Sequence, residues 1–346
     1  MRNPIARFKA ILGELLQHGR TSADRTADLQ ARVNDLHIIL KQNIDQLKQN
    51  IDQLTASVGR LDGDIDALRS GMGQVHHALL SRSWPDLFDP FATTAIACRI
   101  QTLGKLLMPV AAEGHRKIRV GNQFDGGYVM VDDWAGILGA VSIGIGDNDV
   151  WDREILDRGI PVAQYDHTID RPVTMSRGMT WHRVGIGATD TGELRTLRSI
   201  IHLAGFPEVG DLILKLDAEA AEWDALETDD AAPLERFRQL VVEFHWFDRI
   251  IDDAWFATAE RTIARISRSH APIHVHANNG VGMALLGGVC FPRVLEVTFA
   301  RRDAYTMREC QETFPTALDA PCHSGRPDHF LGAFRFSKPP VTHIRS

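Results

Sequence analysis

The stretch LGAVSIGIGDNDVWDREILDRGIPVAQYD, residues 138–166, decides the fold class. It opens with an apolar run at 138–146 that ends in glycines. A helix-like segment closed by Gly159 follows, and then a second apolar run at 160–166. Apolar strands that alternate with helices are typical of a mostly parallel sheet covered on both faces.

The same alternation continues through most of the remaining chain. Residues 118–131 are two apolar runs around Asp125-Gly126-Gly127, which predicts a hairpin. The last two strands are separated only by the glycine-rich segment at 280–293, so the last strand is expected to be antiparallel. The prediction is therefore an α/β, Rossmann-like, seven-stranded mostly parallel sheet with helices on both faces. Beyond residue 166, strands are expected at 179–187, 211–217, 237–246, 271–279 and 294–301, and helices at 191–205, 218–226 and 252–269.

A heptad repeat precedes this domain. From Ile44 to Met72 apolar residues alternate steps of three and four, with Ile or Val at four of the five a positions and Leu at all four d positions. The heptad KQNIDQL occurs twice in tandem, at 41–47 and 48–54. This pattern favours a parallel two-stranded coiled coil. We expect the chain to form a homodimer through it, and a single helix folded onto the domain is the alternative.

The repeat and the alternating region define the domain organisation. We assign an N-terminal helix and coiled coil to 1–80, a linker to 81–94 and the α/β domain to 95–346. Pro85 and Pro90 are expected to end the long helix. The first 20 residues have one apolar helical face, which suits packing on protein or contact with a membrane surface.

Composition and charge exclude several classes of protein. The 346 residues are 44% hydrophobic and 24% charged, as in ordinary globular proteins. A net charge of −7 leaves no basic excess to neutralise a nucleic acid backbone. No apolar run approaches the roughly 20 residues that span a bilayer, and we expect a cytoplasmic protein. The four cysteines share no CxxC spacing, as expected of free thiols: Cys98, Cys290, Cys310 and Cys322.

Gly144 and Gly146 end the first strand and open a helix. Glycines at that point let a ligand approach the backbone, although a tight turn alone also uses them. Asp166 ends the next strand, where a carboxylate can take both ribose hydroxyls of an adenosine. The three residues together predict a site for an adenosine cofactor.

The acidic loop Asp147-Asn148-Asp149 separates two classes of such cofactor. A dinucleotide site calls for a third glycine at 149 and an uncharged helix start for the pyrophosphate. S-adenosylmethionine carries a sulfonium and an ammonium group and no phosphate. The loop therefore favours S-adenosylmethionine, with Asp147 and Asp217 as further cofactor-binding residues.

Polar residues gather at the expected carboxyl ends of the later strands. Histidine is the best base near neutral pH, so His245 is the candidate base, with Asp217 and Glu219 as further catalytic residues. Glu243, His276 and Asn278 are assigned to the methyl acceptor.

Each of these assignments has a simpler alternative. A histidine in a strand is commonly a hydrogen-bonded core residue, and Asp217 and Glu219 can cap the following helix. Asp217, His245 and Asn278 also offer donors that suit Mg²⁺. We do not expect the reaction to need a metal.

Several short segments, taken in order, resemble the FkbM-like methyltransferases, in the branch with a DGGY motif. The resemblance covers about residues 95–335 and implies a class I methyltransferase fold and O-methylation of a sugar or natural product. One departure is Ala220, which stands where the family has a glycine, so that its methyl narrows the approach to the backbone. The segments are R-x-G-x-x-x-DGGY (119–128), SIGIGDN, QYDHT, LKLDAEAAEWDAL, VVEFHW, HVHANN and VLEVTF.

Two other functions remain open from the sequence. One is an NAD-dependent oxidoreductase, against which the acidic loop argues. The other is a non-catalytic coiled-coil scaffold with a degenerate methyltransferase domain, which Ala220 supports. In a methyltransferase, a small-molecule or glycan acceptor would contact the loops at 168–180, 247–253 and 280–292.

Overall fold

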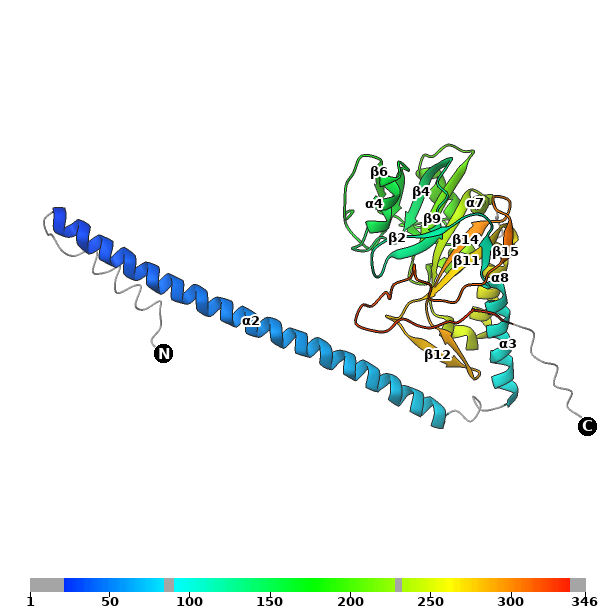
Figure 1. Cartoon of the computed structure of the whole chain (residues 1–346), viewed down its shortest axis with the longest axis horizontal. Helices are drawn as coiled ribbons and strands as arrows, with labels where there is room; N and C mark the ends of the chain where they lie inside the picture. The colour runs from blue at the N-terminus through cyan, green and yellow to red at the C-terminus, as the bar shows by residue number, and fades with distance from the viewer. Residues whose placement is uncertain (1–21, 84–89, 228–231, 337–346) are drawn as a thin grey trace, which may run out of the picture. The chain divides into compact units, whose positions relative to one another are not determined.

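The structure is a computed structural model that describes residues 22–83, 90–227 and 232–336 (Figure 1). The chain divides into two compact units, Met1–Trp84 and Pro85–Ser346. In the described ranges no helix combines the length and the apolar character that crossing a membrane requires. The apolar face expected in residues 1–20 lies outside these ranges.

The first unit contains one helix, α2 (Ser22–Ser83), of 62 residues. At 1.5 Å per residue it is about 90 Å long, and it continues through Gly59, Gly63 and Gly71. The seam side chains from Ile44 to Val58 are exposed in the single chain, among them Leu47 at 60% and Leu54 at 66%. The helix buries none of these side chains by itself.

The expected linker at 81–94 is shorter in the structure. Helix α2 extends to Ser83, and helix α3 (Pro90–Leu106) begins at Pro90. The expectation that Pro90 ends a helix is wrong, because proline suits the first turn of a helix, where its missing N–H has no partner to lose.

The second unit is built on a seven-stranded sheet with the order β11-β14-β10-β9-β4-β5-β6. Strand β14 is antiparallel to both its neighbours, and the other pairings are parallel. The expected mostly parallel sheet and antiparallel last strand are confirmed. The strands are β4 (Ile137–Ile143), β5 (Val162–Tyr165), β6 (Met179–His182), β9 (Asp211–Leu216), β10 (Phe237–Phe244), β11 (His270–Ala277) and β14 (Leu295–Arg301).

Helices cover one face of this sheet. Leu214 and Val242 from the sheet share a buried apolar cluster with Leu103 of α3 and Ile263 of α8. Alternate residues of a strand point to opposite faces, so Leu212, Leu214 and Leu216 all serve this cluster. Helix α8 spans Asp253–Ser269, and the other helices that contribute to the cluster are α5 (Leu197–Leu203), α6 (Ala221–Leu226), α7 (Ala232–Glu235) and the 3₁₀ helix η2 (Phe247–Ile251).

The opposite face is covered by helix α4 (Val150–Asp157) and by the hairpin of β2 (Lys117–Gly121) and β3 (Gly127–Val131). The hairpin expected around residues 125–127 is confirmed. The Gln239 side chain pairs with the backbone N–H and C=O of Val131, and Thr298 donates to the Val129 carbonyl. Strand β1 (Val110–Ala112) pairs with β15 (Met307–Glu309) nearby. Polar side chains of this face therefore lie under a β-hairpin.

Two expected elements differ in the structure. The helix at 191–205 begins only at Leu197, because Asp190 accepts hydrogen bonds from the Thr196 N–H and the Ser199 hydroxyl and holds the preceding turn. Ahead of it β7 (Gly185–Ile186) pairs with β8 (Leu194–Arg195). The segment at 280–292, taken as a loop, contains a hairpin of β12 (Met283–Leu286) and β13 (Val289–Pro292).

Candidate active site

The loop after β4 requires glycine at its first position. Gly144 has φ +78°, and a Cβ built on it would lie 1.5 Å from the carbonyl oxygen of Asp217. Any other residue would push β4 and β9 apart at the end where they open. The close approach of these two strand ends therefore depends on glycine at position 144.

Asp166 holds this loop in place. One oxygen of its carboxylate accepts from the N–H groups of Ile145 and Gly146, both at 2.9 Å, and the other accepts from the N–H and hydroxyl of Thr168. Although burial opposes the charge, these donors lower the pKa of Asp166. Four donors fill the lone-pair sites of a carboxylate. A ribose hydroxyl can therefore bind Asp166 only by replacing one of them.

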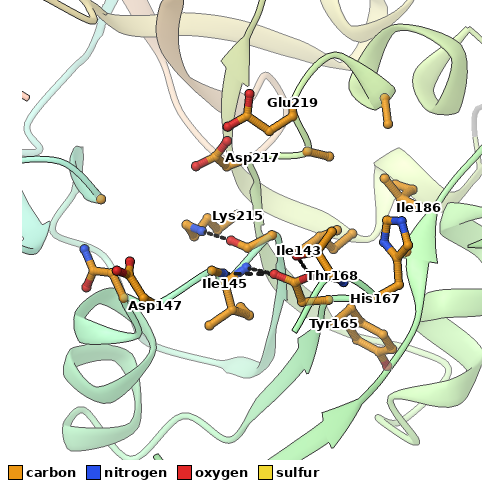
Figure 2. A pocket seen from close by; sticks show the side chains of 18 of the residues that line it. Ile143, Ile145, Asp147, Tyr165, His167, Thr168, Ile186, Lys215, Asp217 and Glu219 are labelled. Carbon is orange, nitrogen blue, oxygen red and sulfur yellow. Dashed lines mark hydrogen bonds between the residues drawn. The ribbon is translucent and has the colours of Figure 1, made fainter. Parts of the chain in front are cut away.

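A cavity of ≈ 390 Å³ opens above the carboxyl ends of β4, β5 and β9 (Figure 2). Its size suits a small-molecule ligand. All five residues predicted to bind the cofactor line it: Gly144, Gly146, Asp147, Asp166 and Asp217.

The cavity wall is strongly acidic. Five carboxyl residues line it, against one lysine and one histidine. Lys215 is 4% exposed, and its Nζ donates to the Gly144 carbonyl at 2.5 Å. Asp149 was expected to face the cofactor together with Asp147. It does not line the cavity, because its side chain is buried and pairs with Arg153 at 3.0 Å. The carboxyl residues are Asp125, Asp147, Asp166, Asp217 and Glu219.

The structure brings together the three predicted catalytic residues. The Nε2 atom of His245 lies 3.9 Å from Asp217 and 3.6 Å from Glu219. Glu222, which is fully buried, accepts from the backbone N–H of His245 at 2.8 Å and lies 3.0 Å from its Nδ1. This carboxylate orients the ring so that Nε2 points toward Asp217 and Glu219, which line the cavity. His245 itself is 5% exposed and is not a lining residue, so an acceptor reaches Nε2 only past these two carboxylates.

The charges around His245 set its proton affinity. Burial favours the neutral ring, but the hydrogen bond to Glu222 and the charges of Glu222, Asp217 and Glu219 prevail and raise the pKa of His245 above its usual value of 6.5. The ring therefore accepts a proton more readily than a free histidine does.

A row of titratable side chains crosses four strands beside the cavity. In the strand register, Glu243 on β10 lies opposite Glu296 on β14, and Glu296 lies opposite His276 on β11. Asp217 lies one residue beyond the last paired positions of β9 and β10. Asn278 donates to Glu243 at 2.9 Å. Burial and repulsion by Asp217 and Glu296 raise the pKa of Glu243 well above its usual value.

The three residues assigned to the acceptor occupy this row, behind the wall. Glu243 and His276 are 4% and 2% exposed, and neither they nor Asn278 line the cavity. In this conformation these three side chains cannot contact an acceptor bound in the cavity. Asp125 lines the cavity instead.

The DGGY motif supplies two residues that the sequence reasoning did not assign. Tyr128 is 2% exposed, and its hydroxyl has no hydrogen-bond partner among the described residues. Burial and the charges of Asp217, Glu243, Glu296 and Asp125 raise its pKa well above 10. Partial withdrawal from water and repulsion by Glu296 and Asp217 raise the pKa of Asp125 to about 6, although the residue as a whole stays exposed.

Ala220 adopts a backbone conformation that favours glycine. Its φ is +86°, in the left-handed region, directly before helix α6. An L side chain is strained there by roughly 1–2 kcal/mol. Glycine would adopt this conformation without that strain.

We therefore expect Ala220→Gly to stabilise the protein by about 0.5–1 kcal/mol, because relief of the strain exceeds the added freedom of the unfolded chain. Urea unfolding of the full-length protein measures this difference. Ala225→Gly, inside α6, is the control and should destabilise by about 1 kcal/mol. A destabilised Ala220→Gly variant would show that the left-handed conformation costs the alanine nothing.

Comparison of the sequence with models of known protein families finds no match, and a search of curated proteins finds none either. The function must therefore be inferred from the geometry and charge of the cavity.

Proposed function

We propose that the second unit is an S-adenosylmethionine-dependent methyltransferase that methylates a hydroxyl group. The acidic cavity at the carboxyl ends of β4, β5 and β9 carries this proposal. Five carboxyl residues facing one lysine suit a ligand with a sulfonium and an ammonium group. The same wall would repel the pyrophosphate of NAD.

The strand order supports the proposal. Numbered along the chain, the sheet strands run 3-2-1-4-5-7-6 across the sheet, with the seventh antiparallel. This mostly parallel, Rossmann-like sheet is compatible with the class I methyltransferase fold that the FkbM-like resemblance implies. In open α/β sheets the ligand lies beyond the carboxyl ends of the strands, at the point where the strand order reverses. Here that point is β4, with Gly144 at its end.

The cavity residues have separate roles in cofactor binding and in proton transfer. The cofactor, when bound, supplies an electrophilic methyl group. Gly144 and Gly146 admit it to the backbone, and Asp166 keeps the loop between them rigid. His245 takes the proton of the acceptor hydroxyl at Nε2, and Glu222 stabilises the resulting imidazolium. An acceptor hydroxyl on a sugar or natural product fits the family resemblance.

The cofactor assignment is tested by calorimetry of the full-length protein with S-adenosylmethionine and with NAD. We expect S-adenosylmethionine to bind and NAD not to bind. A protein that binds NAD alone is an oxidoreductase candidate, and one that binds neither supports the scaffold alternative.

Asp166→Ala should weaken S-adenosylmethionine binding by about 1.5–3 kcal/mol, the scale of hydrogen bonds to a charged group. The variant releases the N–H groups of Ile145 and Gly146 and removes the carboxylate from the cavity. Asp190→Ala is the matched control, since Asp190 also accepts from a backbone N–H and a hydroxyl and lies outside this cavity. Equal affinity of the wild type and Asp166→Ala for S-adenosylmethionine would show that Asp166 does not contribute to cofactor binding.

We also propose that helix α2 pairs with α2 of a second copy in a parallel coiled coil. The seam residues from Ile44 to Val58 are 44–66% exposed in the single chain. The polar positions between them offer no other apolar face. A second identical seam would cover these side chains, with Ile and Val at a and Leu at d.

A further inference from the structure

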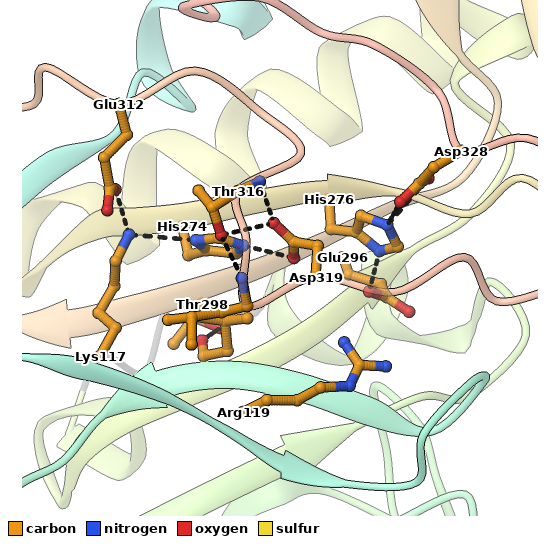
Figure 3. Close-up of polar contacts among 12 residues, drawn as sticks. Lys117, Arg119, His274, His276, Glu296, Thr298, Glu312, Thr316, Asp319 and Asp328 are labelled. Carbon is orange, nitrogen blue, oxygen red and sulfur yellow. Dashed lines mark hydrogen bonds and ion pairs between the residues drawn. The ribbon is translucent and has the colours of Figure 1, made fainter.

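A second cluster of ligand-type side chains lies beside the cavity, and none of its three members lines it. Cys322 is 9% exposed, His276 2% and Glu296 5%. They come from the segment after β15, from β11 and from β14. Figure 3 shows His276 between the carboxylates of Glu296 and Asp328. A thiol, an imidazole and a carboxylate are the three side-chain donors that bind zinc.

The ligand atoms of these three side chains lie within 4.8 Å of one another, close enough to share one ion. The thiol sulfur of Cys322 lies 3.3 Å from Glu296 Oε1 and 4.0 Å from His276 Nδ1, and His276 Nδ1 lies 2.7 Å from Glu296 Oε2. Zinc binds sulfur at about 2.3 Å and nitrogen or oxygen at about 2.0–2.1 Å, so tetrahedral ligand atoms stand about 3.3–3.6 Å apart. The observed separations lie on both sides of this range. To bind the ion, the nitrogen–oxygen separation would lengthen by about 0.6 Å and the sulfur–nitrogen separation would shorten by about 0.4 Å.

The far side of His276 provides an independent observation. Its Nε2 lies 3.0 Å from Asp328, whose side chain is 15% exposed. Metal-binding histidines usually donate their second ring N–H to a carboxylate, which fixes the ring and strengthens the ligand. With Nε2–H directed at Asp328, Nδ1 is the nitrogen that faces Cys322 and Glu296.

The surrounding charge favours a dication. Carboxylate oxygens of Asp125 and Glu243 lie within 4.8 Å of each other and of Glu296. Three cations lie nearby, and none forms an ion pair with Glu296 in the described ranges. Lys117 pairs with Glu312, and Lys215 donates to the Gly144 carbonyl. Arg119 donates through Nε and Nη2 to the carbonyls of Asn122 and Phe124, while its Nη1 has no hydrogen-bond partner among the described residues. The Tyr128 hydroxyl, without a partner in those ranges, lies among the same carboxylates.

We propose that Cys322, His276 and Glu296 bind one zinc ion, with a water molecule as the fourth ligand. Binding replaces the thiol proton and the Nδ1 proton, and both leave to solvent. The ion joins the segment after β15 to strands β11 and β14. From Cys310 to Phe336 that segment has no helix or strand among the described residues. The ion would add to the hydrogen bonds that Asp319 and Asp328 already make to His274 and His276.

The site escapes sequence reasoning because its ligands stand at 276, 296 and 322, without the short spacing of a zinc motif. Without the ion the same groups are linked by hydrogen bonds alone, with the Cys322 thiol donating to Glu296 and His276 bridging Glu296 and Asp328. The experiment must separate these two states.

The first test is metal analysis of full-length protein that has been loaded with Zn²⁺ and then freed of unbound ions. We expect one zinc per chain in the wild type and none in Cys322→Ser or His276→Gln. Cys310→Ser is the matched control, because Cys310 is also buried but contacts Glu312, and it should retain the zinc. Zinc retained by Cys322→Ser, or absent from the folded wild type, overturns the proposal.

A second measurement does not depend on how the variants fold. Co²⁺ added to zinc-free wild-type protein should produce the thiolate-to-cobalt charge-transfer absorption and the visible bands of a tetrahedral site. An octahedral cobalt spectrum without the thiolate band overturns the assignment of Cys322. S-adenosylmethionine binding is measured on the same zinc-free sample, so that the failure of either proposal is seen separately.

Discussion

We expect His245→Gln to lower the rate of methyl transfer by about 10²–10⁴ while S-adenosylmethionine still binds. Glutamine keeps a polar group against Glu222 but cannot accept the proton of the acceptor. The substitution leaves Gly144 and Asp166, which we propose bind the cofactor, unchanged. Single-turnover kinetics with saturating cofactor measures the loss, and calorimetry checks that the affinity for the cofactor is unchanged.

A second buried histidine provides the control. His270 is fully buried, its Nε2 contacts the Phe237 carbonyl at 2.7 Å, and it lies outside the cavity. His270→Gln should lower the free energy of unfolding and leave the rate per folded molecule unchanged. If His245→Gln behaves in the same way, His245 is a core residue and the base is another group.

The pH dependence follows from the direction of the pKa shift. A base must be neutral to act, and the pKa of His245 is raised above 6.5, so the rate should increase with pH through a value above 6.5. Stability changes in the opposite direction. The imidazolium stabilises the fold at pH values below the unfolded-state pKa, and this contribution is lost as pH rises through the folded-state pKa. Activity should therefore rise in the range where this part of the stability falls.

Removal of residues 1–80 should convert a dimer into a folded, cofactor-binding monomer. The seam that we propose for pairing lies in these residues, and the cavity lining begins at Asp125. Light scattering on the full-length and shortened proteins measures the mass. Micromolar full-length protein that scatters as a monomer would falsify the coiled coil.

Substitutions in the intact chain test the same surface without a deletion. Leu47→Asp together with Leu54→Asp places charges at two d positions and should yield monomers. Gln46→Asp together with Gln53→Asp is the control, since both glutamines lie one residue away from the seam. The control pair should leave the mass unchanged.

The seven strands of the sheet were predictable because each is a local apolar run between turn signals. The hairpin β12–β13 was missed, since its segment contains glycines and a mixture of buried and exposed residues such as Leu286 and Leu285. The start of α5 was missed because the turn held by Asp190 competes with the helix for the same residues. The spacing of apolar residues does not reveal such competition between a turn and a helix.

The candidate site was predictable where strand ends mark it. Gly144, Asp166 and Asp217 stand at the ends of expected strands, and all three line the cavity. Lys215 and Glu222 were missed, although a lysine within the apolar run DLILKLD is a signal that could have found the first. The four hydrogen bonds of Asp166 and the contact of His245 with Glu222 depend on loop geometry. Sequence spacing does not determine that geometry.

The insertion of β14 between β10 and β11 has a consequence for how the protein is made. A ribosome delivers β10 and β11 first and the strand that separates them last. Until Leu295–Arg301 has emerged, the facing edges of both earlier strands lack their hydrogen-bonding partner. Exposed edges of this kind recruit other chains. The nascent protein is thus prone to aggregation until β14 has emerged and Glu296 has joined Glu243 and His276.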